Sequence, residues 1–376
     1  MLEYIYICRH GFRSNWVDPN IKTSPTGMNR DPPLAVYGHE QSQILSSFLS
    51  DPSKTAPYPT PELVFSSPFY RCIETALPTA KALGIAGEEG KDGVKLEHGV
   101  MEWYSPVIPS TGLHPRPSKP NSLIPFFPPN SIDPSYCSTV FPSRRGESLK
   151  DLHERAEIFI EAWTGKVEST WPEVKSVVIF AHAASLIALG RALTGNKELS
   201  VTAGCASTSL YKRKLPIGPT ESFESTLPSH RQPYDSRPSS SLNTPFLTAL
   251  APASPAFGSL SGIATPPAFA PLSRPPSPPL RSGIQPCGVG EWDIIWNGKA
   301  DYLPNGLERN WSFKDVVLKE DGEVINDKGD GEGHEVDDEW PEGLAEGAEE
   351  WLRRGRPPFG NNIKKSGVGL GINSRM

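Results

Sequence analysis

Two histidines, three arginines and one glutamate in this sequence lie just after predicted strands or at predicted helix starts. They are Arg9, His10, Arg13, Arg71, Glu102 and His182. A phosphoryl group carries negative charge on its non-bridging oxygens, and arginine offers fixed, planar donors for those oxygens. A neutral imidazole nitrogen can attack phosphorus when neighbouring charges keep the ring unprotonated. The set therefore predicts phosphoryl transfer through a histidine.

His10 is the predicted nucleophile because Arg9 and Arg13 flank it and disfavour its protonation. Glu102 is the predicted proton donor to the leaving oxygen, on the condition that its surroundings raise its pKa. Two ordinary alternatives stay open on the residues alone. Arg71 could pair with Glu74 on its own helix, and a different acid in the neighbourhood of Glu102, such as the nearby Glu97, could serve.

The predicted strands and helices alternate along the first part of the chain. Strands are expected at residues 3–10, 63–65, 94–97, 177–180 and 205–214, with amphipathic helices between them. This alternation predicts an α/β fold, a three-layer α/β/α arrangement with a mostly parallel central sheet. The carboxyl ends of such strands converge on one crevice, where His10 and His182 would meet.

Composition divides the chain into four parts. Residues 1–214 form the predicted catalytic domain, and within them 105–145 is Pro-rich yet apolar enough to be an ordered excursion. Residues 215–287 are rich in Ser, Pro and Thr and are predicted to be disordered. Residues 288–318 return as a closing strand, which pairs with 205–214 across the insertion. Residues 319–376 are a mostly disordered tail, acidic and then basic.

The charge balance and the cysteines exclude several classes of protein. The chain has 37 Lys and Arg against 43 Asp and Glu, so its net charge of −6 gives no sign of direct nucleic-acid binding. Five cysteines without a C-x-x-C pair indicate free thiols and no zinc site. We expect no metal and no cofactor. Neither a signal peptide nor a membrane span is expected, which favours the cytoplasm or the nucleus.

Five short motifs occur in the order found in the histidine phosphatase superfamily, which has the phosphoglycerate mutase-like fold. They are CRHG, SSPFYRCIETA, EHGVMEW, RRGESLKDLHERA and FAHAAS. The resemblance covers residues 1–214 and about 288–303. It implies that His10 becomes phosphohistidine, that Arg9, Arg71 and His182 hold the phosphate, and that Glu102 donates a proton and later activates water. It also implies that no metal is needed.

Other positions bear on the branch of the family. Arg13 matches an R-H-G-x-R pattern of the acid-phosphatase branch and of phosphatases related to T-cell ubiquitin ligand proteins, and Asn15 lies where mutase-like members carry a polar phosphate contact. Phe12 replaces a glutamate common after R-H-G, and Ala183 replaces a glycine usual in mutases. The chain resembles the ubiquitin-ligand-type phosphatases and the fungal proteins that include the histidine-phosphatase-like subunit of transcription factor IIIC.

The main functional prediction is a metal-independent phosphomonoester hydrolase that acts on a phosphorylated small molecule or phosphoprotein. One alternative is a phosphatase-fold interaction module in a transcription factor IIIC-like complex, with protein partners recruited through the Ser/Pro-rich segment. The other is a mutase-type phosphotransferase. Four aromatic residues around the excursion predict a large or aromatic leaving group: Trp103, Tyr104, Phe126 and Phe127.

Overall fold

The computed structural model describes residues 1–87, 90, 92–214, 288–316, 327, 342–345 and 348. The chain divides into two compact units, Met1–Leu215 with Gly283–Met376 and, separately, Pro216–Ser282. The predicted disordered insertion at 215–287 and most of the predicted tail at 319–376 lie outside the described residues. Within those residues, no helix is both long and apolar enough to cross a membrane.

A six-stranded mixed sheet forms the centre of the first unit, in the order β3-β2-β5-β1-β6-β7. The strands are β1 (Tyr4–Arg9), β2 (Leu63–Ser66), β3 (Lys95–Leu96), β5 (Ser176–Ala181), β6 (Thr208–Arg213) and β7 (Trp292–Lys299). The first four of these run parallel to one another, β6 runs antiparallel to β1, and β7 runs antiparallel to β6. Arg9 pairs with Ala181 at the last step of the β1–β5 register, so His10 and His182 leave adjacent strands at one level.

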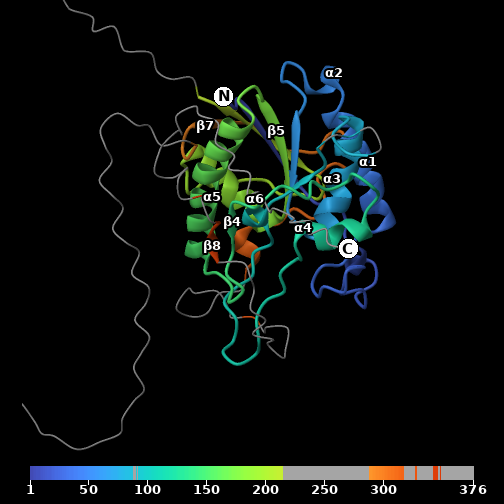
Figure 1. The fold of residues 1–376 in the computed structure, drawn as a ribbon, viewed down its shortest axis with the longest axis vertical. Helices are drawn as coiled ribbons and strands as arrows, with labels where there is room; N and C mark the ends of the chain where they lie inside the picture. The colour runs from blue at the N-terminus through green and yellow to red at the C-terminus, as the bar shows by residue number, and fades with distance from the viewer. Residues whose placement is uncertain are drawn as a thin grey trace, which may run out of the picture. The chain divides into compact units, whose positions relative to one another are not determined.

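Helices cover both faces of this sheet (Figure 1), which confirms the predicted α/β class. The helices are α1 (Val36–Leu49), α2 (Pro52–Thr55), α3 (Tyr70–Ala82), α4 (Pro120–Leu123), α5 (Leu149–Thr170) and α6 (Ala183–Thr194). Short 3-10 turns occur at η1 (Ser14–Trp16), η2 (His98–Val100), η3 (Ile124–Phe126) and η4 (Phe313–Asp315). Pro78 lies inside α3 without ending it.

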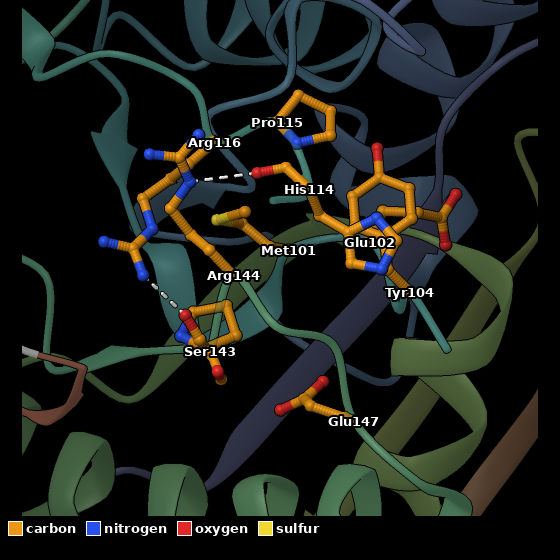
Figure 2. A pocket seen from close by; sticks show the side chains of 10 residues that line it. Met101, Glu102, Tyr104, His114, Pro115, Arg116, Ser143, Arg144 and Glu147 are labelled. Atoms are coloured by element: carbon orange, nitrogen blue, oxygen red, sulfur yellow. Dashed lines mark hydrogen bonds between the residues drawn. The ribbon is translucent and has the colours of Figure 1, made fainter. Parts of the chain in front are cut away.

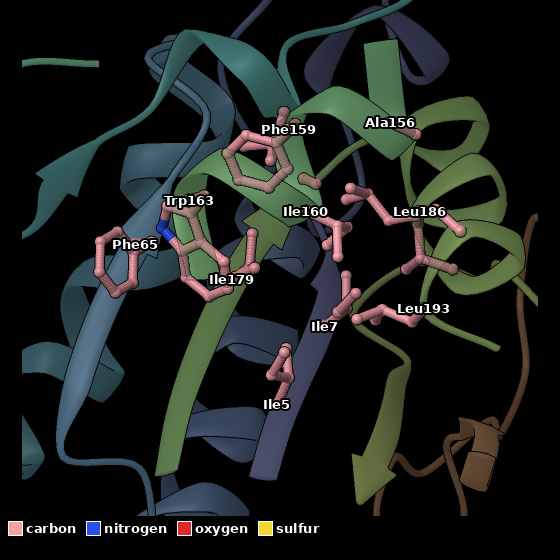
Figure 3. Packing of buried hydrophobic residues seen from close by; sticks show 14 of the residues in the cluster. Ile5, Ile7, Phe65, Ala156, Phe159, Ile160, Trp163, Ile179, Leu186 and Leu193 are labelled. Carbon is pink, nitrogen blue, oxygen red and sulfur yellow. The ribbon is translucent and has the colours of Figure 1, made fainter. Parts of the chain in front are cut away.

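Alternation along β1 sends its side chains into two separate cores. Ile5 and Ile7 pack with Trp163 of α5 on one face, as Figure 3 shows. Tyr6 and Cys8 pack with Phe48 of α1 on the other. A strand that is apolar on both faces suits a central position between two helical layers. This burial fixes the register of β1 and thereby the position of His10 at its end.

The last two strands of the sheet order form a hairpin. β6 and β7 pair antiparallel, from Thr208 with Lys299 to Arg213 with Trp292, although residues 215–287 separate them in sequence. The predicted closing segment extends beyond this strand. Residues 303–316, here called the strap, run from the segment after β7 back to the end of β1 and to the loop between α6 and β6. Ala203 N–H donates to Asn310 Oδ1 at 2.8 Å, and Cys205 N–H donates to Glu308 O at 2.9 Å.

The excursion at 105–145 is largely irregular, but it is fixed to the domain by buried polar contacts. Glu97 accepts hydrogen bonds from the backbone N–H groups of Gly99 and Thr139 and from Tyr136 Oη–H. β4 (Val140–Phe141) pairs antiparallel with β8 (Gly343–Leu344) in a second small sheet. The contacts of Glu97 join the excursion to η2.

Candidate active site

His10 lies directly after β1 and is 1% exposed. Its Nδ1 is 2.8 Å from the carbonyl oxygen of Gly11, which can only accept a hydrogen bond. Nδ1 therefore carries the proton of the neutral ring, and Nε2 carries the lone pair. The backbone N–H of His10 donates to Ala181 O at 3.0 Å, which links the histidine to β5. The imidazole is oriented for nucleophilic attack through Nε2.

The surroundings of His10 keep its ring neutral. Burial is the largest cause that lowers the pKa of His10 well below its ordinary value, and the positive charges of Arg71, Arg9 and Arg13 lower it further. His182 adds a smaller effect in the same direction, and the centroids of the two imidazole rings are 5.5 Å apart. The requirement for an unprotonated nucleophile is thus met at neutral pH.

Arg71 is fully buried at the start of α3, where it connects the other site residues. Its Nη1 donates to Asp31 Oδ1 at 2.8 Å, and its Nη2 donates to Glu102 Oε2 at 3.1 Å and lies 3.1 Å from His182 Nδ1. The alternative pairing with Glu74 is wrong. That carboxylate accepts from Leu34 N–H at 2.7 Å and leaves Arg71 free to serve the site.

His182 caps the N-terminus of α6 and is completely buried. Its Nε2 lies 2.8 Å from Ser67 Oγ and 3.4 Å from Cys72 Sγ. Burial is the largest cause that lowers the pKa of His182, to about 4, although Glu102 opposes it. His182 is therefore a neutral polar group at physiological pH. Both ring nitrogens have partners here, since Nδ1 faces the Arg71 donor and Nε2 faces Ser67 Oγ, so the role of His182 as a phosphate contact stays a prediction.

Glu102 is 22% exposed, and its Oε2 lies 3.4 Å from His182 Nδ1. Burial alone would raise the pKa of Glu102, but His182, Arg71 and Arg13 together lower it below its ordinary value. The condition set for proton donation is not met in this ligand-free state, in which Glu102 is a carboxylate. Glu97 does not offer a substitute, because its oxygens accept bonds from the backbone of η2 and the excursion.

Only part of the Arg9 guanidinium is used in hydrogen bonds within the fold. Its Nη1 donates to Ala203 O at 2.6 Å and to Arg309 O at 2.5 Å, while its Nε is buried without a hydrogen-bond partner among the described residues. Arg13 has its guanidinium carbon 4.3 Å from the centroid of the Trp16 ring. Burial is the largest cause that lowers the pKa of Arg13, to about 10, so the side chain stays charged at neutral pH.

Asn15 is not joined to this cluster. Its Oδ1 is buried and has no hydrogen-bond partner in the described part of the chain. Its role as a phosphate contact stays a prediction. His10, Glu102 and His182 offer ligand atoms that all lie within 4.8 Å of one another, a spacing that a metal ion could use. Arg9, Arg13 and Arg71 surround this trio, and their charges favour an anion over a cation.

A pocket opens beside Glu102, between the end of η2 and the excursion (Figure 2). It is lined by Met101, Glu102, Tyr104, His114, Pro115, Arg116, Pro142, Ser143, Arg144 and Glu147. Tyr104 stacks on His114 with their ring centroids 4.7 Å apart. Phe126 and Phe127 do not line it, and Phe127 stacks on Tyr70 instead. Of the four aromatic residues predicted to shape the entrance, only Tyr104 lines this pocket.

Several residues that support the site were not predicted. Asp31 and Ser67 hold Arg71 and His182, and Thr75 Oγ1 accepts from Gly11 N–H at 3.0 Å. Gly38 allows α1 to approach the loop after β1, because a Cβ there would lie 2.2 Å from Phe12 O. The turn Ser66-Ser67-Pro68 was a usable signal for Ser67. Nothing in the local pattern marked Asp31.

Comparison with known proteins finds similarities over the part of the chain that holds this site. Residues 5–104 match the histidine phosphatase superfamily (branch 1). The chain is 38% identical over 196 residues to the transcription factor tau 55 kDa subunit of Saccharomyces cerevisiae, across 52% of this chain and 42% of that protein. It is 26% identical over 223 residues to ecdysteroid-phosphate phosphatase of Drosophila melanogaster, across 51% of this chain and 27% of that protein.

Among solved structures, the ecdysone phosphate phosphatase of Bombyx mori in complex with tungstate matches with 18% identity and a TM-score of 0.42. The match covers 56% of this chain and 89% of that one. The chain spans less than half the length of both curated relatives. The matched range 5–104 contains His10, Arg9, Arg71 and Glu102 in the arrangement described above. Residues 5–104 of this chain, which carry these four residues, are therefore similar to the histidine phosphatase superfamily (branch 1).

Proposed function

We propose that this chain is a phosphatase-fold subunit of a transcription-factor assembly, located in the nucleus and working with protein partners. The observation that supports this is the 38% identity to a protein named as a transcription factor subunit. This function is the alternative to a free-standing hydrolase that the sequence left open, and the similarity to that subunit favours it. Fold alone does not decide between the two, because the same fold can serve catalysis or assembly.

Affinity purification of the full-length tagged chain from its own cells tests this proposal. We expect mass spectrometry to recover other subunits of one transcription factor in stoichiometric amounts. A tagged variant without residues 216–282 serves as a matched comparison, because these residues are assigned to a different unit from the one that holds the site. Partners that persist bind through the phosphatase fold, and partners that are lost bind through the removed segment. Recovery of the full-length chain alone would contradict the proposal.

A second function, hydrolysis of phosphate monoesters, is favoured by the arrangement around His10. Its Nδ1 donates to Gly11 O, so Nε2 is free to attack phosphorus while the ester P–O bond breaks. Arg9, Arg13 and Arg71 supply the positive charge that a phosphoryl group requires. Water then attacks the phosphohistidine, releases phosphate and returns His10 to its neutral form.

Glu102 has two roles in this scheme. A phosphate dianion that enters the cluster places negative charge beside the carboxylate and raises the pKa of Glu102 from its lowered value. Protonated Glu102 then donates to the leaving oxygen. In the second step the carboxylate removes a proton from the attacking water. The arginines that lower the pKa of Glu102 in the empty site are thereby balanced by the substrate itself.

Hydrolysis of an aryl phosphate by the wild type and by His10→Ala tests this second function. We expect the wild type to turn over and the variant to lose activity by a factor of about 10³ or more, because it lacks the covalent nucleophile. Acid-sensitive labelling of His10 with phosphate should appear in the wild type alone. Equal rates in both proteins would exclude the mechanism, and no turnover in either would leave the subunit function without catalysis.

A further inference from the structure

Three arginines gather on one tryptophan beside the proposed phosphate site. The guanidinium carbons of Arg13, Arg309 and Arg9 lie 4.3, 5.0 and 5.8 Å from the centroid of the Trp16 ring. Trp16 belongs to η1 and is partly exposed. Arg309 comes from the strap, 300 residues beyond Arg9 in sequence and outside the range that matches the family.

Arg13 and Arg309 lie at the site without a direct ion-pair partner among the residues that the structure describes, although Glu102 acts on Arg13 from a distance. Glu308 is adjacent in sequence, but its Oε2 accepts from Gln41 Nε2 at 3.0 Å and from Tyr37 Oη–H. Like charges held on one ring repel each other, and the attraction of a cation to a tryptophan face offsets this only in part. This cluster therefore favours an anion.

The backbone of the strap places Arg309 there. Its carbonyl oxygen accepts from Arg9 Nη1 at 2.5 Å, and the flanking residues bond to the loop that follows α6 through Cys205 N–H and Ala203 N–H. Arg309 has a φ of 50°, in the left-handed region that non-glycine residues rarely adopt. The side chain is exposed to solvent, while its backbone is fixed on the same arginine that serves the phosphate.

We propose that Arg309, Arg13 and Trp16 form a second anion subsite, which binds a negative group of the ligand other than the phosphate at His10. This inference rests on the proposed phosphate site, which it deepens by naming the ligand class. The ligand is a phosphate compound whose remaining part carries another anionic group. Arg9 joins the two subsites, because it contacts the strap carbonyl and also acts on His10.

Calorimetric titration of the full chain with orthophosphate and with pyrophosphate tests the subsite at low ionic strength. We expect wild type to bind pyrophosphate about tenfold more tightly, because the second phosphate engages Arg309. Arg309→Asn removes the charge and keeps a residue that tolerates positive φ. It should bring the ratio of the two affinities close to one. Lys212→Asn is the matched control, since it also removes one exposed positive charge. Lys212 pairs with Tyr4 at the start of β1, whereas His10 follows the other end of that strand.

The outcomes separate this inference from the proposed site. If wild type binds neither ion, the phosphate site and the subsite are both excluded. If it binds orthophosphate, but Arg309→Asn keeps the wild-type ratio, the phosphate site stands and the subsite is wrong. An equal fall of the ratio in Lys212→Asn would also overturn the subsite, because net charge would then account for the preference. If the preference for pyrophosphate over orthophosphate is lost in Arg309→Asn but kept in Lys212→Asn, the result supports the second anion subsite.

Discussion

His10 and His182 follow two paired strands of the sheet, whereas Arg309 and Tyr104 come from the strap and from the loop after η2. The first pair is fixed by a register that buried side chains determine on both faces of β1 and β5. The second pair is held by a few hydrogen bonds and ring contacts. The sheet half and the loop half of the site therefore rest on different physical supports.

The difference indicates a division of labour. In the sheet half, buried groups hold each other in place, as Asp31 and Ser67 hold Arg71 and His182. Such a half suits chemistry that is common to a family. In the loop half, Arg309 is exposed. Loops held on a rigid scaffold commonly carry specificity. Changes in the sheet half should impair phosphate binding and stability together, and changes in the loop half should affect selectivity first.

The largest effect is expected from Arg71→Met. It leaves Asp31, which is 2% exposed, without its ion-pair partner, and removes the donor to Glu102. We expect orthophosphate binding to be lost and the free energy of unfolding in urea to fall by about 3–5 kcal/mol at pH 7. The double variant Arg71→Met with Asp31→Asn should regain part of the stability but none of the binding. Phosphate affinity that survives in Arg71→Met would show that this arginine is structural only.

A smaller effect is expected from pH. The pKa of His182 is about 4 in the folded protein, below its ordinary value of 6.5, so the unfolded chain binds the extra proton first as pH falls. Stability is therefore lost from pH 6.5 downward, by about 2 kcal/mol at pH 5 for this group. His10 acts in the same direction. Glu102, whose folded pKa is lowered, adds a loss only below its ordinary value.

Urea unfolding at pH 6.5 and pH 5 measures this effect in the wild type and in His182→Gln. The variant keeps a polar partner for Ser67 and lacks the titrating ring. Its stability should change less than that of the wild type between the two pH values, by about 2 kcal/mol. Parallel behaviour of both proteins would mean that His182 does not titrate across folding.

The two halves also differ in how far the sequence could predict them. Alternating apolar residues and a histidine after each of two strands were sufficient to place His10 and His182 at one edge of the sheet. Proton donation by Glu102 was predicted on the condition of a raised pKa, but its pKa is lowered, because His182, Arg71 and Arg13 approach it in the folded chain. Pairwise charge effects of this kind depend on distances that a sequence does not contain.

Arg309 illustrates what local patterns leave out. Its contact with Arg9 spans 300 residues, and the strap from 303 to η4 has no regular period that would reveal a buried face. Asp31 could not be predicted for the same reason. It lies in an irregular loop, and its partner Arg71 is 40 residues away in the sequence. The periodicity of helices and strands predicts which of their residues are buried. Irregular segments have no such pattern, so their contacts can be identified only in the folded structure.

The smallest effect, and the one that best separates the two halves, is expected from Glu308→Ala. Gln41 and Tyr37 on α1 lose the carboxylate that ties the strap to this helix, which should cost about 1 kcal/mol. The amide of Cys205, which donates to Glu308 O, should then exchange faster with deuterium, while the amide of His10 should not change. Glu308→Gln, which keeps an acceptor oxygen, should have a stability and a Cys205 exchange rate between those of the wild type and Glu308→Ala.

The same variant tests whether the strap positions Arg309. If the strap merely lies beside the site, the preference for pyrophosphate should persist in Glu308→Ala. If it positions Arg309, that preference should fall while orthophosphate still binds to the sheet half.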